Sequence, residues 1–259
     1  MSQVIVNLFS GSRPLFLHDL KFPSALRLVV LAPHPDDFDA IGITLRFFRD
    51  NGNRIDVAVV TSGASGVLDE FFPGATAMAK AEIREKEQRA SCQFFGLPES
   101  SLTFLRLKED EQGHPRETGE NVARVRQHLA ARRPDLVFLP HGNDANAGHR
   151  RTYSIFHKIA SEEVHPLVAL LGRDPKTIQM RHDLYATFGP AEAEWKGQLL
   201  RFHQSQHHRN LKSRGHGIDD RILRLNRKIA EEMQGNAMYA EVFELEPYGV
   251  RDQRSTQQL

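Results

Sequence analysis

The chain has 259 residues, of which 40% are hydrophobic and 26% are charged, a balance typical of a globular protein with a sizeable core. Its 34 Lys and Arg against 33 Asp and Glu leave a formal net charge of +1, so no overall field draws it to nucleic acid or to an anionic membrane. No apolar run reaches the length of a membrane span, and the first residues lack a secretory-signal pattern. The lone Cys92, expected to be packed within a helix, excludes an internal disulfide and favours a reducing compartment, most simply the cytoplasm.

Apolar runs and helical patterns alternate along the chain. Strands are predicted, in chain order, at 26–32, 54–61, 101–107, 134–140, 182–188 and 237–246. Helices are predicted between or after them at 39–52, 77–95, 121–133, 151–160 and 219–233. This alternation predicts right-handed crossovers, and therefore an α/β fold with a mostly parallel sheet covered by helices on both faces.

The chain is expected to form one domain over residues 1–259. Its core spans about 26–190, and a C-terminal elaboration spans about 191–248. The elaboration starts as a helix, continues through a basic, His-rich stretch, and is followed by the helix and strand given above. The last residues, 249–259, are expected to be frayed.

Two polar segments directly follow apolar strands. PHPDD (33–37) follows the strand at 26–32, and HGNDANAGH (141–149) follows the strand at 134–140. Ligands of parallel sheets bind beyond the carboxyl ends of the strands. If both strands belong to one parallel sheet, the two segments emerge at the same edge and meet in one crevice.

The residue types in these segments suit a catalytic metal site. His34 and Asp37, three apart on a tight turn, can converge on one ion, and His149 can supply a third ligand from the second segment. Zn²⁺ accepts imidazole nitrogens and carboxylate oxygens, and catalytic sites keep a position for water. Bound zinc lowers the pKa of its water from about 16 to about 7, and Asp36 is free to take the proton. Such a set suits hydrolysis of an amide.

Simpler interpretations of both segments stay open at this point. Asp37 or Asp39 could cap the helix that begins near residue 39. The second segment could be an ordinary Gly/Asn turn. The coincidence of both segments with strand ends favours the metal site.

The segments LAPHPDDFDAIGITLRFF and NDANAGHRRTY resemble the two motifs of the LmbE-like / PIG-L family of zinc-dependent deacetylases. Weaker matches in AEIREKEQRASCQFFGLPE, EWKGQLLRFHQSQ and YAEVFELE extend the likeness over about residues 26–246. The resemblance implies a Rossmann-like fold, the LmbE-like fold, with one zinc ion per chain, although another divalent ion could take its place.

The resemblance also implies roles for individual residues. It assigns His34, Asp37 and His149 as metal ligands, Asp36 as the general base, and Arg84 as a contact of the substrate. Family members remove acetyl or related acyl groups from amino sugars and their conjugates. The expected substrate is therefore a small molecule, an N-acylated amino sugar or a related conjugate, cleaved at a linear C–N amide bond.

Two positions depart from the family pattern. Asn146 stands where relatives commonly carry a histidine thought to stabilise the oxyanion or to protonate the leaving amine. An Asn amide can donate a hydrogen bond to an oxyanion but cannot deliver a proton, so the acid role falls to Asp36 or to a group such as His141. Phe38 replaces a frequent acidic residue, for which Asp39 could stand in.

Four further features are candidates for binding. His203 and His207 could hold a second metal, but are expected to be surface or cleft-wall side chains. TSGASG (61–66) is expected to form a cleft wall. Asp110 could contact sugar hydroxyls or be a solvated acidic turn. The basic stretch 207–217 is the best local anion-binding candidate, with a flexible solvated loop as the alternative.

Three functions stay in view. The main expectation is a metal-dependent amidohydrolase, an N-deacetylase of amino sugars. The alternatives are a non-catalytic metal- or sugar-binding protein of the same fold, and a hydrolase of a non-sugar amide or ester. No nucleic-acid partner is expected, and a homo-oligomer is possible because relatives often assemble.

Overall fold

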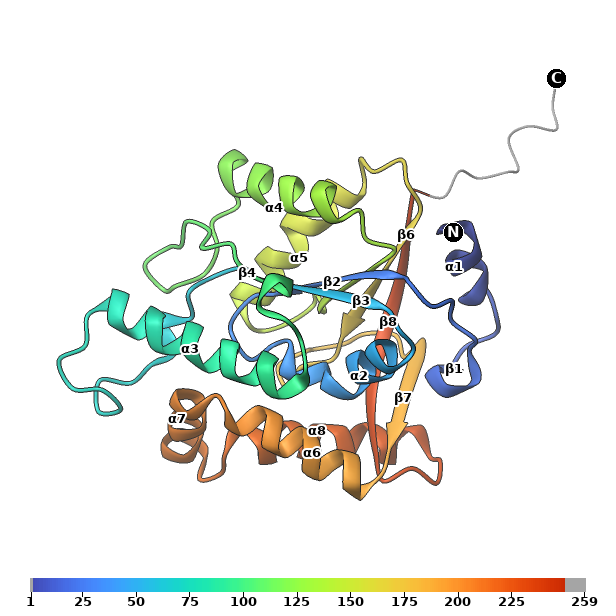
Figure 1. Cartoon of the computed structure of the whole chain (residues 1–259). Helices are drawn as coiled ribbons and strands as arrows, with labels where there is room; N and C mark the ends of the chain where they lie inside the picture. Colours follow the sequence, from blue (N-terminus) through green and yellow to red (C-terminus); the bar gives the residue numbers. More distant parts are fainter. Residues whose placement is uncertain (1, 250–259) are drawn as a thin grey trace.

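The computed structural model describes residues 2–249 and arranges them around an eight-stranded sheet (Figure 1). The strand order across this sheet is β1-β7-β8-β6-β5-β2-β3-β4. The strands are β1 (Leu15–Phe16), β2 (Arg27–Ala32), β3 (Arg54–Val59), β4 (Leu102–Phe104), β5 (Leu136–Pro140), β6 (Leu167–Gly172), β7 (Leu184–Phe188) and β8 (Tyr239–Tyr248). Neighbouring strands are parallel except at β8, which runs antiparallel to both β6 and β7. The predicted mostly parallel sheet is confirmed.

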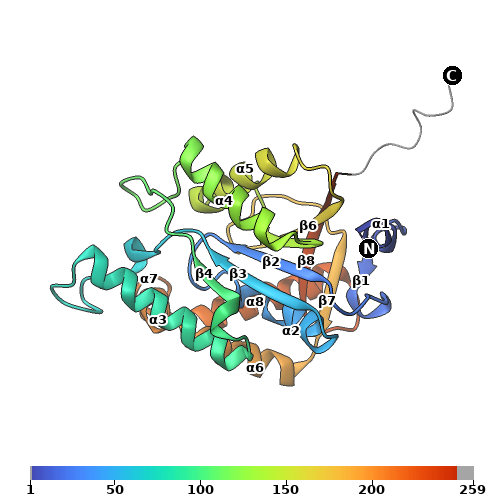
Figure 2. The ribbon, with the colours of Figure 1, turned by 45° about the horizontal axis from the view of Figure 1, so that its top comes forward.

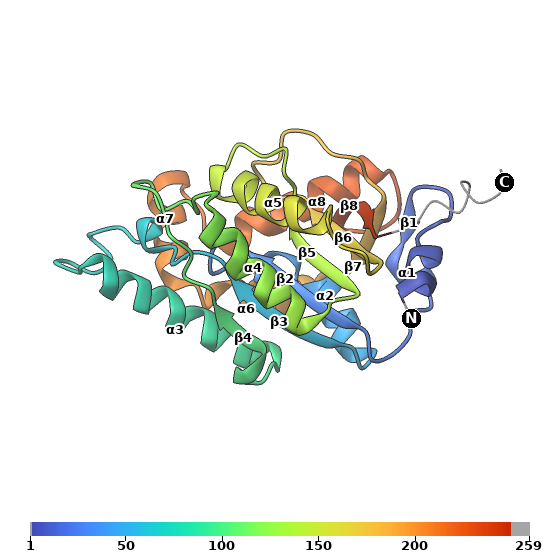
Figure 3. The ribbon, with the colours of Figure 1, turned by 90° about the horizontal axis from the view of Figure 1, so that it is seen from above.

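Helices cover both faces of the sheet, as Figures 1 and 3 show. The helices are α1 (Ser2–Leu8), α2 (Gly42–Asp50), α3 (Ala77–Phe95), α4 (Gly119–Arg132), α5 (Ala147–Ala160), α6 (Pro190–Arg201), α7 (Gln204–Arg214) and α8 (Ile218–Met233). Within residues 2–249, none of them combines the length and the apolar character needed to cross a bilayer.

Successive residues of β2 face opposite layers. Leu28 and Val30 pack in a core with α2, α3 and α6, whereas Val29 and Leu31 pack in a second core with α4 and α5. Because both faces are buried, the central strands are almost continuously apolar, which is why the sequence reveals them. In Figure 2, β2, β3 and β4 run side by side, with α4 and α3 on opposite sides of them.

The C-terminal segment belongs partly to the sheet. β8 lies between β6 and β7 in the strand order. α8 packs against it, with Ile229 and Ala230 in one cluster with Ala240 and Val242. The end of the elaboration is thus built into the sheet, whereas α6, α7 and α8 lie together on the face opposite α4 and α5 (Figure 1).

Some boundaries differ from the prediction. No strand was predicted where β6 lies, because LVALLG is rich in Leu and Ala, which favour helices. β4 is shorter than the predicted 101–107, and Arg106 adopts φ of 45°, outside the extended region. α5 begins four residues before the predicted 151, because Asn146 caps it.

The basic stretch 207–217 is not a flexible loop, so that interpretation is wrong. It forms most of α7, which ends at Gly215 with φ of 75°. α7 is largely polar and carries no apolar stripe, which is the signal by which a helix is predicted. The frayed tail predicted at 249–259 lies, beyond residue 249, outside the described residues.

Candidate metal and hydrolase site

The two polar segments meet at the carboxyl edge of the sheet. β2 and β5 are neighbouring parallel strands, so residues 33–37 and 141–149 leave the sheet side by side. The imidazole rings of His34 and His149 lie 5.6 Å apart between centroids. The structure therefore brings together two segments that are more than a hundred positions apart, as their places at strand ends predict.

Three side chains here could hold one metal ion. One potential ligand atom from each of His34, Asp37 and His149 lies within 4.8 Å of the others. Asp37 Oδ2 is 3.2 Å from His34 Nδ1, and Asp37 Oδ1 is 3.4 Å from His149 Nε2. The other nitrogen of His149, Nδ1, faces Asp144 Oδ2 at 3.3 Å, an arrangement that orients metal-binding histidines. Two imidazoles and a carboxylate fit the expected zinc ion.

The backbone before His149 leaves room for the first histidine. A Cβ atom on Gly148 would lie 2.7 Å from His34 Nε2, closer than real Cβ atoms come. Asn146 Oδ1 accepts a hydrogen bond from the backbone N–H of Gly148 at 2.9 Å. This cap starts α5 where its first turn carries the buried His149 against the PHPDD turn.

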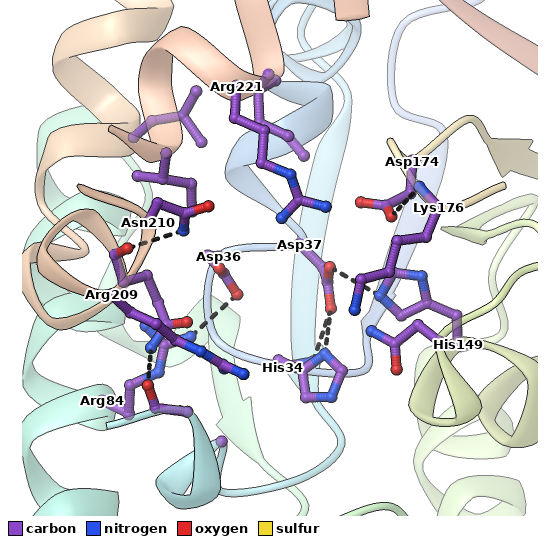
Figure 4. Close-up of a pocket in the computed structure, with 18 of the residues that line it drawn as sticks. His34, Asp36, Asp37, Arg84, His149, Asp174, Lys176, Arg209, Asn210 and Arg221 are labelled. Carbon is purple, nitrogen blue, oxygen red and sulfur yellow. Dashed lines mark hydrogen bonds and ion pairs between the residues drawn. The ribbon is translucent and has the colours of Figure 1, made fainter. Parts of the chain in front are cut away.

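Asp36 lies beside these ligands in a strained backbone conformation. Its φ is 112°, a value that non-glycine residues rarely adopt because it strains the backbone. Arg84 donates hydrogen bonds to Asp36 Oδ1 at 3.0 Å and to the carbonyl of Pro35. Gln88 Oε1 accepts one from the backbone N–H of Asp36 at 3.2 Å. These contacts hold the turn and keep the Asp36 carboxylate at the pocket wall (Figure 4).

The two neighbouring carboxylates differ in proton affinity. Burial raises the pKa of Asp36 above its ordinary value, and the Arg84 guanidinium offsets only part of that rise. Burial acts in the same direction on Asp37, but His149 and His34 hold the pKa of Asp37 below its usual range. Burial lowers the pKa of His149, yet the Asp37 and Asp144 carboxylates raise it well above the ordinary value overall. The Asp37 carboxylate therefore stays ionised, while that of Asp36 binds a proton more readily.

Arg84 connects the metal site with α7. Its side chain is buried and its guanidinium donates to Glu87 Oε2 at 3.2 Å and Ser205 Oγ at 3.4 Å, besides the bonds to the PHPDD turn. Glu87 Oε1 in turn accepts the backbone N–H of Ser205 at 2.6 Å. Arg84 lines the pocket, where a substrate contact was expected, but its hydrogen bonds run to protein groups. Arg84 is therefore placed to hold the Asp36 carboxylate in position.

His203 is neither a surface nor a cleft-wall residue, so that prediction is wrong. Its side chain is 0% exposed, and its Nε2 lies 2.7 Å from Oδ2 of the equally buried Asp39. Gln88 also donates to that oxygen at 3.1 Å. His207 lies on α7 with Nδ1 3.3 Å from Asp219 Oδ1. Neither histidine belongs to a potential metal cluster within residues 2–249.

Two predicted substrate contacts lie outside the pocket lining. The Asp110 carboxylate accepts backbone hydrogen bonds from His114 and Gln112 and pairs with Arg151 at 2.6 Å. The His114 N–H in particular lowers the pKa of Asp110 to about 2. His141 is held on both nitrogens: Nδ1 accepts the N–H of Asn143 at 3.0 Å, and Nε2 lies 3.3 Å from Glu244. The structure thus engages both side chains with other protein groups.

A cavity of about 330 Å³ opens beside the metal cluster, large enough for a small ligand. Gly63, Ser65 and Gly66 line it, which confirms that the TSGASG segment is a cleft wall. Asn146 also lines it, and its Oδ1 is used as the helix cap. The Asn146 amide nitrogen is therefore the part of this side chain available to a ligand.

Four cationic side chains also line the cavity, and the sequence singled out none of them individually. They are Lys176, Arg209, Arg214 and Arg221. The sequence indicates the stretch 207–217 only as a whole, and nothing in it places Lys176 or Arg221 near the candidate metal cluster. The turn after β6 and the first turn of α8 bring them there (Figure 4).

The sequence model of the family described as PIG-L, GlcNAc-PI de-N-acetylase, matches residues 29–160. This stretch makes up half of the chain and contains both polar segments. The chain belongs to this family. No curated protein sequence matches it significantly.

Solved structures share its fold. N,N'-diacetylchitobiose deacetylase from Pyrococcus horikoshii superposes with a TM-score of 0.71 at 19% identity, covering 86% of this chain and 84% of the other. GalB, the 4-carboxy-2-hydroxymuconate hydratase from Pseudomonas putida KT2440, gives 0.67 at 17% identity, with 89% and 99% covered. The zinc-inhibited form of teicoplanin deacetylase Orf2 gives 0.66 at 16%, with 87% and 100% covered. At these identities the likeness establishes the LmbE-like fold.

Proposed function

We propose that this protein is a metal-dependent N-deacetylase that hydrolyses the amide of an N-acylated amino sugar or a similar small conjugate. The observation that carries the proposal is the cluster of His34, Asp37 and His149 with an unliganded carboxylate, Asp36, at the same cavity wall. Membership of a de-N-acetylase family supports the amide as the bond that is cleaved.

A divalent ion held by the three ligands would supply an electrophile for the acyl carbonyl and a more acidic water. Asp36 is placed to accept the proton of the attacking water and to return it to the departing amine. The Arg84 guanidinium, 3.0 Å from Asp36 Oδ1, holds that carboxylate in place. The Asn146 amide nitrogen can donate a hydrogen bond to the oxyanion that forms when water adds. Cleavage of the C–N bond then releases a carboxylate and a free amine.

The proposal is tested by measuring acetate and free amine released from a panel of N-acetylated sugars, after the metal content of the protein has been determined. We expect acetate and free amine to be released in equal amounts. A chelator should abolish this release, and added metal should restore it. Zinc is added back stepwise, because one protein of this fold is described in a zinc-inhibited form. A protein that holds one metal ion and releases nothing from any amide or ester would instead favour the binding protein without catalysis.

A second candidate is the addition of water to an unsaturated carboxylate. A neighbour of similar fold is described as a hydratase of 4-carboxy-2-hydroxymuconate, and the cationic side chains of this pocket suit a carboxylate. An activated water serves both reactions, so the distinction lies in the product. Hydration consumes an alkene absorbance and releases no amine, whereas deacetylation releases an amine.

We also propose that the whole chain acts as one domain in a reducing compartment such as the cytoplasm. One sheet connects elements from both ends of the described chain. The single thiol, Cys92, is buried in α3, where burial also raises its pKa and keeps it unreactive.

A further inference from the structure

We propose that the substrate carries an anionic group, a carboxylate or a phosphate, which binds to the four cationic side chains facing the metal cluster. These four residues, called here the cationic wall, are Lys176, Arg209, Arg214 and Arg221. This inference rests on the proposed function, because it names the substrate class of the same site.

The cationic wall is assembled from three separate elements. Lys176 lies on the turn after β6, Arg209 and Arg214 on α7, and Arg221 in the first turn of α8. Figure 4 shows Lys176, Arg209 and Arg221 extending from these elements toward the space in front of Asp36 and Asp37. Because the four residues come from separate elements, their convergence on one cavity is not a consequence of local sequence on a single helix.

The charges of the wall are only partly offset by the protein, through the nearby Asp174 carboxylate. Among the described residues, none of the four forms an ion pair with a carboxylate at contact distance. Arg214 donates only to the uncharged Ser213 Oγ at 2.9 Å and Asn210 Oδ1 at 3.4 Å. Burial, together with the nearby charges of Arg221 and Arg209, lowers the pKa of Arg214, as expected for like charges held close together.

Neighbours on the same helices behave differently. Lys212, on α7, pairs with Glu70 at 2.9 Å, and Arg224, on α8, pairs with Asp220 at 2.8 Å. Both are more than half exposed, whereas the unpaired cations face the cavity. Among the described residues, the exposed Lys212 and Arg224 are therefore paired with carboxylates, whereas the cations of the wall make no such contact.

The cavity has a positive excess before any metal is bound. Arg84 and the cationic wall contribute five cationic side chains to the lining, against three carboxylates, Asp36, Asp37 and Asp174. An anion bound there would relieve the repulsion among the cations, and Arg guanidinium groups bind carboxylate and phosphate through paired hydrogen bonds. A volume of about 330 Å³ restricts the ligand to a small molecule.

The test compares three acetylated probes: neutral N-acetylglucosamine, its 6-phosphate, and the carboxylate N-acetylmuramate. Binding is measured by titration calorimetry on the metal-loaded protein, and kcat/KM by acetate release. We expect at least one anionic probe to bind, and to react, roughly 100-fold better than the neutral probe, since each charged hydrogen bond contributes roughly 10-fold or more. The probe with the larger preference distinguishes phosphate from carboxylate.

Variants locate the effect within the pocket. Arg209→Gln and Arg221→Gln should each reduce the preference for the anionic probe about 10-fold. The matched controls Lys212→Gln and Arg224→Gln, on the same two helices, should leave it unchanged. Because these controls remove the same formal charge, they separate a local contact from a general change of net charge.

The outcomes distinguish this inference from the proposed function. If no probe releases acetate but the anionic preference in binding depends on Arg209 and Arg221, the deacetylase proposal fails and the anion site stands. Equal binding of neutral and anionic probes overturns the anion site, as does a preference that survives both pocket substitutions. Such a surviving preference would mean that Arg209 and Arg221 do not bind the anion.

Discussion

The buried cluster around Lys196 and the cationic wall of the cavity differ in whether their charges are paired with other protein groups. Lys196 on α6 is 0% exposed, and its Nζ lies 2.7 Å from Glu241 Oε1 and 2.8 Å from Asn226 Oδ1. The Glu241 carboxylate also accepts the backbone N–H groups of Ile43 and Thr44 at the start of α2. This cluster pairs each charge within the protein and ties α6, α8, β8 and α2 together.

The cationic wall, with three of its four residues on α7 and α8, makes no contact ion pair with a carboxylate of the described residues. The same part of the chain therefore contains charges paired within the fold and charges left for something else. Pairing a buried charge stabilises one structure, whereas an unpaired charge in a cavity costs stability until a ligand neutralises it. Asp36 is paired with Arg84, but it faces the same cavity as the second group and is held in a strained backbone conformation. The contrast separates structural charges from functional ones.

The largest effect is expected on the functional side, from Asp36→Asn. Removing the proton acceptor should lower kcat roughly 10³-fold, because general acid–base catalysis contributes 10²- to 10⁴-fold. Metal content and melting temperature should change little, since Asp36 is not one of the three ligands. Turnover is measured by acetate release, and normal turnover in this variant would refute the role of Asp36 as base.

On the structural side, Lys196→Met should lower the free energy of unfolding by about 3 kcal/mol. The substitution leaves the Glu241 carboxylate buried without its counter-charge, and breaking buried pairs costs 3–5 kcal/mol. Denaturant unfolding measures the change. Lys228→Met, an exposed lysine on α8 paired with Glu232, is the matched control and should shift stability by under about 0.5 kcal/mol. If both variants change the free energy of unfolding by the same small amount, the Lys196–Glu241 pair does not stabilise the fold as proposed.

Asn146 combines both kinds of role, and two substitutions can separate them. Asn146→Asp retains an oxygen that caps α5 but removes the amide donor, so kcat should fall about 10²-fold with little change in stability. Asn146→Ala should show the same loss of turnover and also cost about 1 kcal/mol of stability. If Asn146→Asp retains full activity, this residue only caps the helix.

The smallest effect on stability is expected at a second hydrogen-bonded cluster, formed by Tyr153, Tyr248 and Glu246. Tyr153 donates to Glu246 Oε1 at 2.9 Å, and Tyr248 donates to Glu246 Oε2 at 2.6 Å. Burial, then Glu246, raises the pKa of Tyr153 to about 12 from 10.0. The protonated phenol therefore stabilises the fold fully below about pH 10, and this contribution is lost as pH rises from about 10 to about 12.

Tyr153→Phe should accordingly cost about 1 kcal/mol at pH 8, the value of one hydrogen bond. The difference from the wild-type protein should shrink as the pH approaches 12. Urea unfolding at several pH values follows it. A difference that grows with pH would show that the sign of this linkage is wrong.

Much of the fold could be predicted because the central strands are buried on both faces. Continuous apolar runs identify β2, β3 and β5, and their parallel pairing places the PHPDD turn next to His149. β6 was missed because LVALLG does not distinguish a buried strand from a helix. The sequence pattern also does not show that β8 lies antiparallel between β6 and β7, because pairing depends on distant segments.

The candidate metal cluster could be predicted, but its surroundings could not. His34 and Asp37 directly follow β2, and His149 closes the segment that follows β5, so the sequence pattern predicts that they meet. His203 was misjudged because its burial depends on Asp39, far away in the sequence. Arg221 escaped notice because an arginine in the first turn of a helix looks like a solvated surface residue. Its position over the cavity is set by the packing of α8.

The most direct test of the account is the metal content of four purified proteins: the wild type, His34→Ala, His149→Ala and Asp36→Asn. The account predicts one divalent ion per chain in the wild type and in Asp36→Asn, and strongly reduced metal in a folded His149→Ala protein. Retention of a full equivalent by His149→Ala, together with His34→Ala, would contradict the central claim that these two loops close around a single ion.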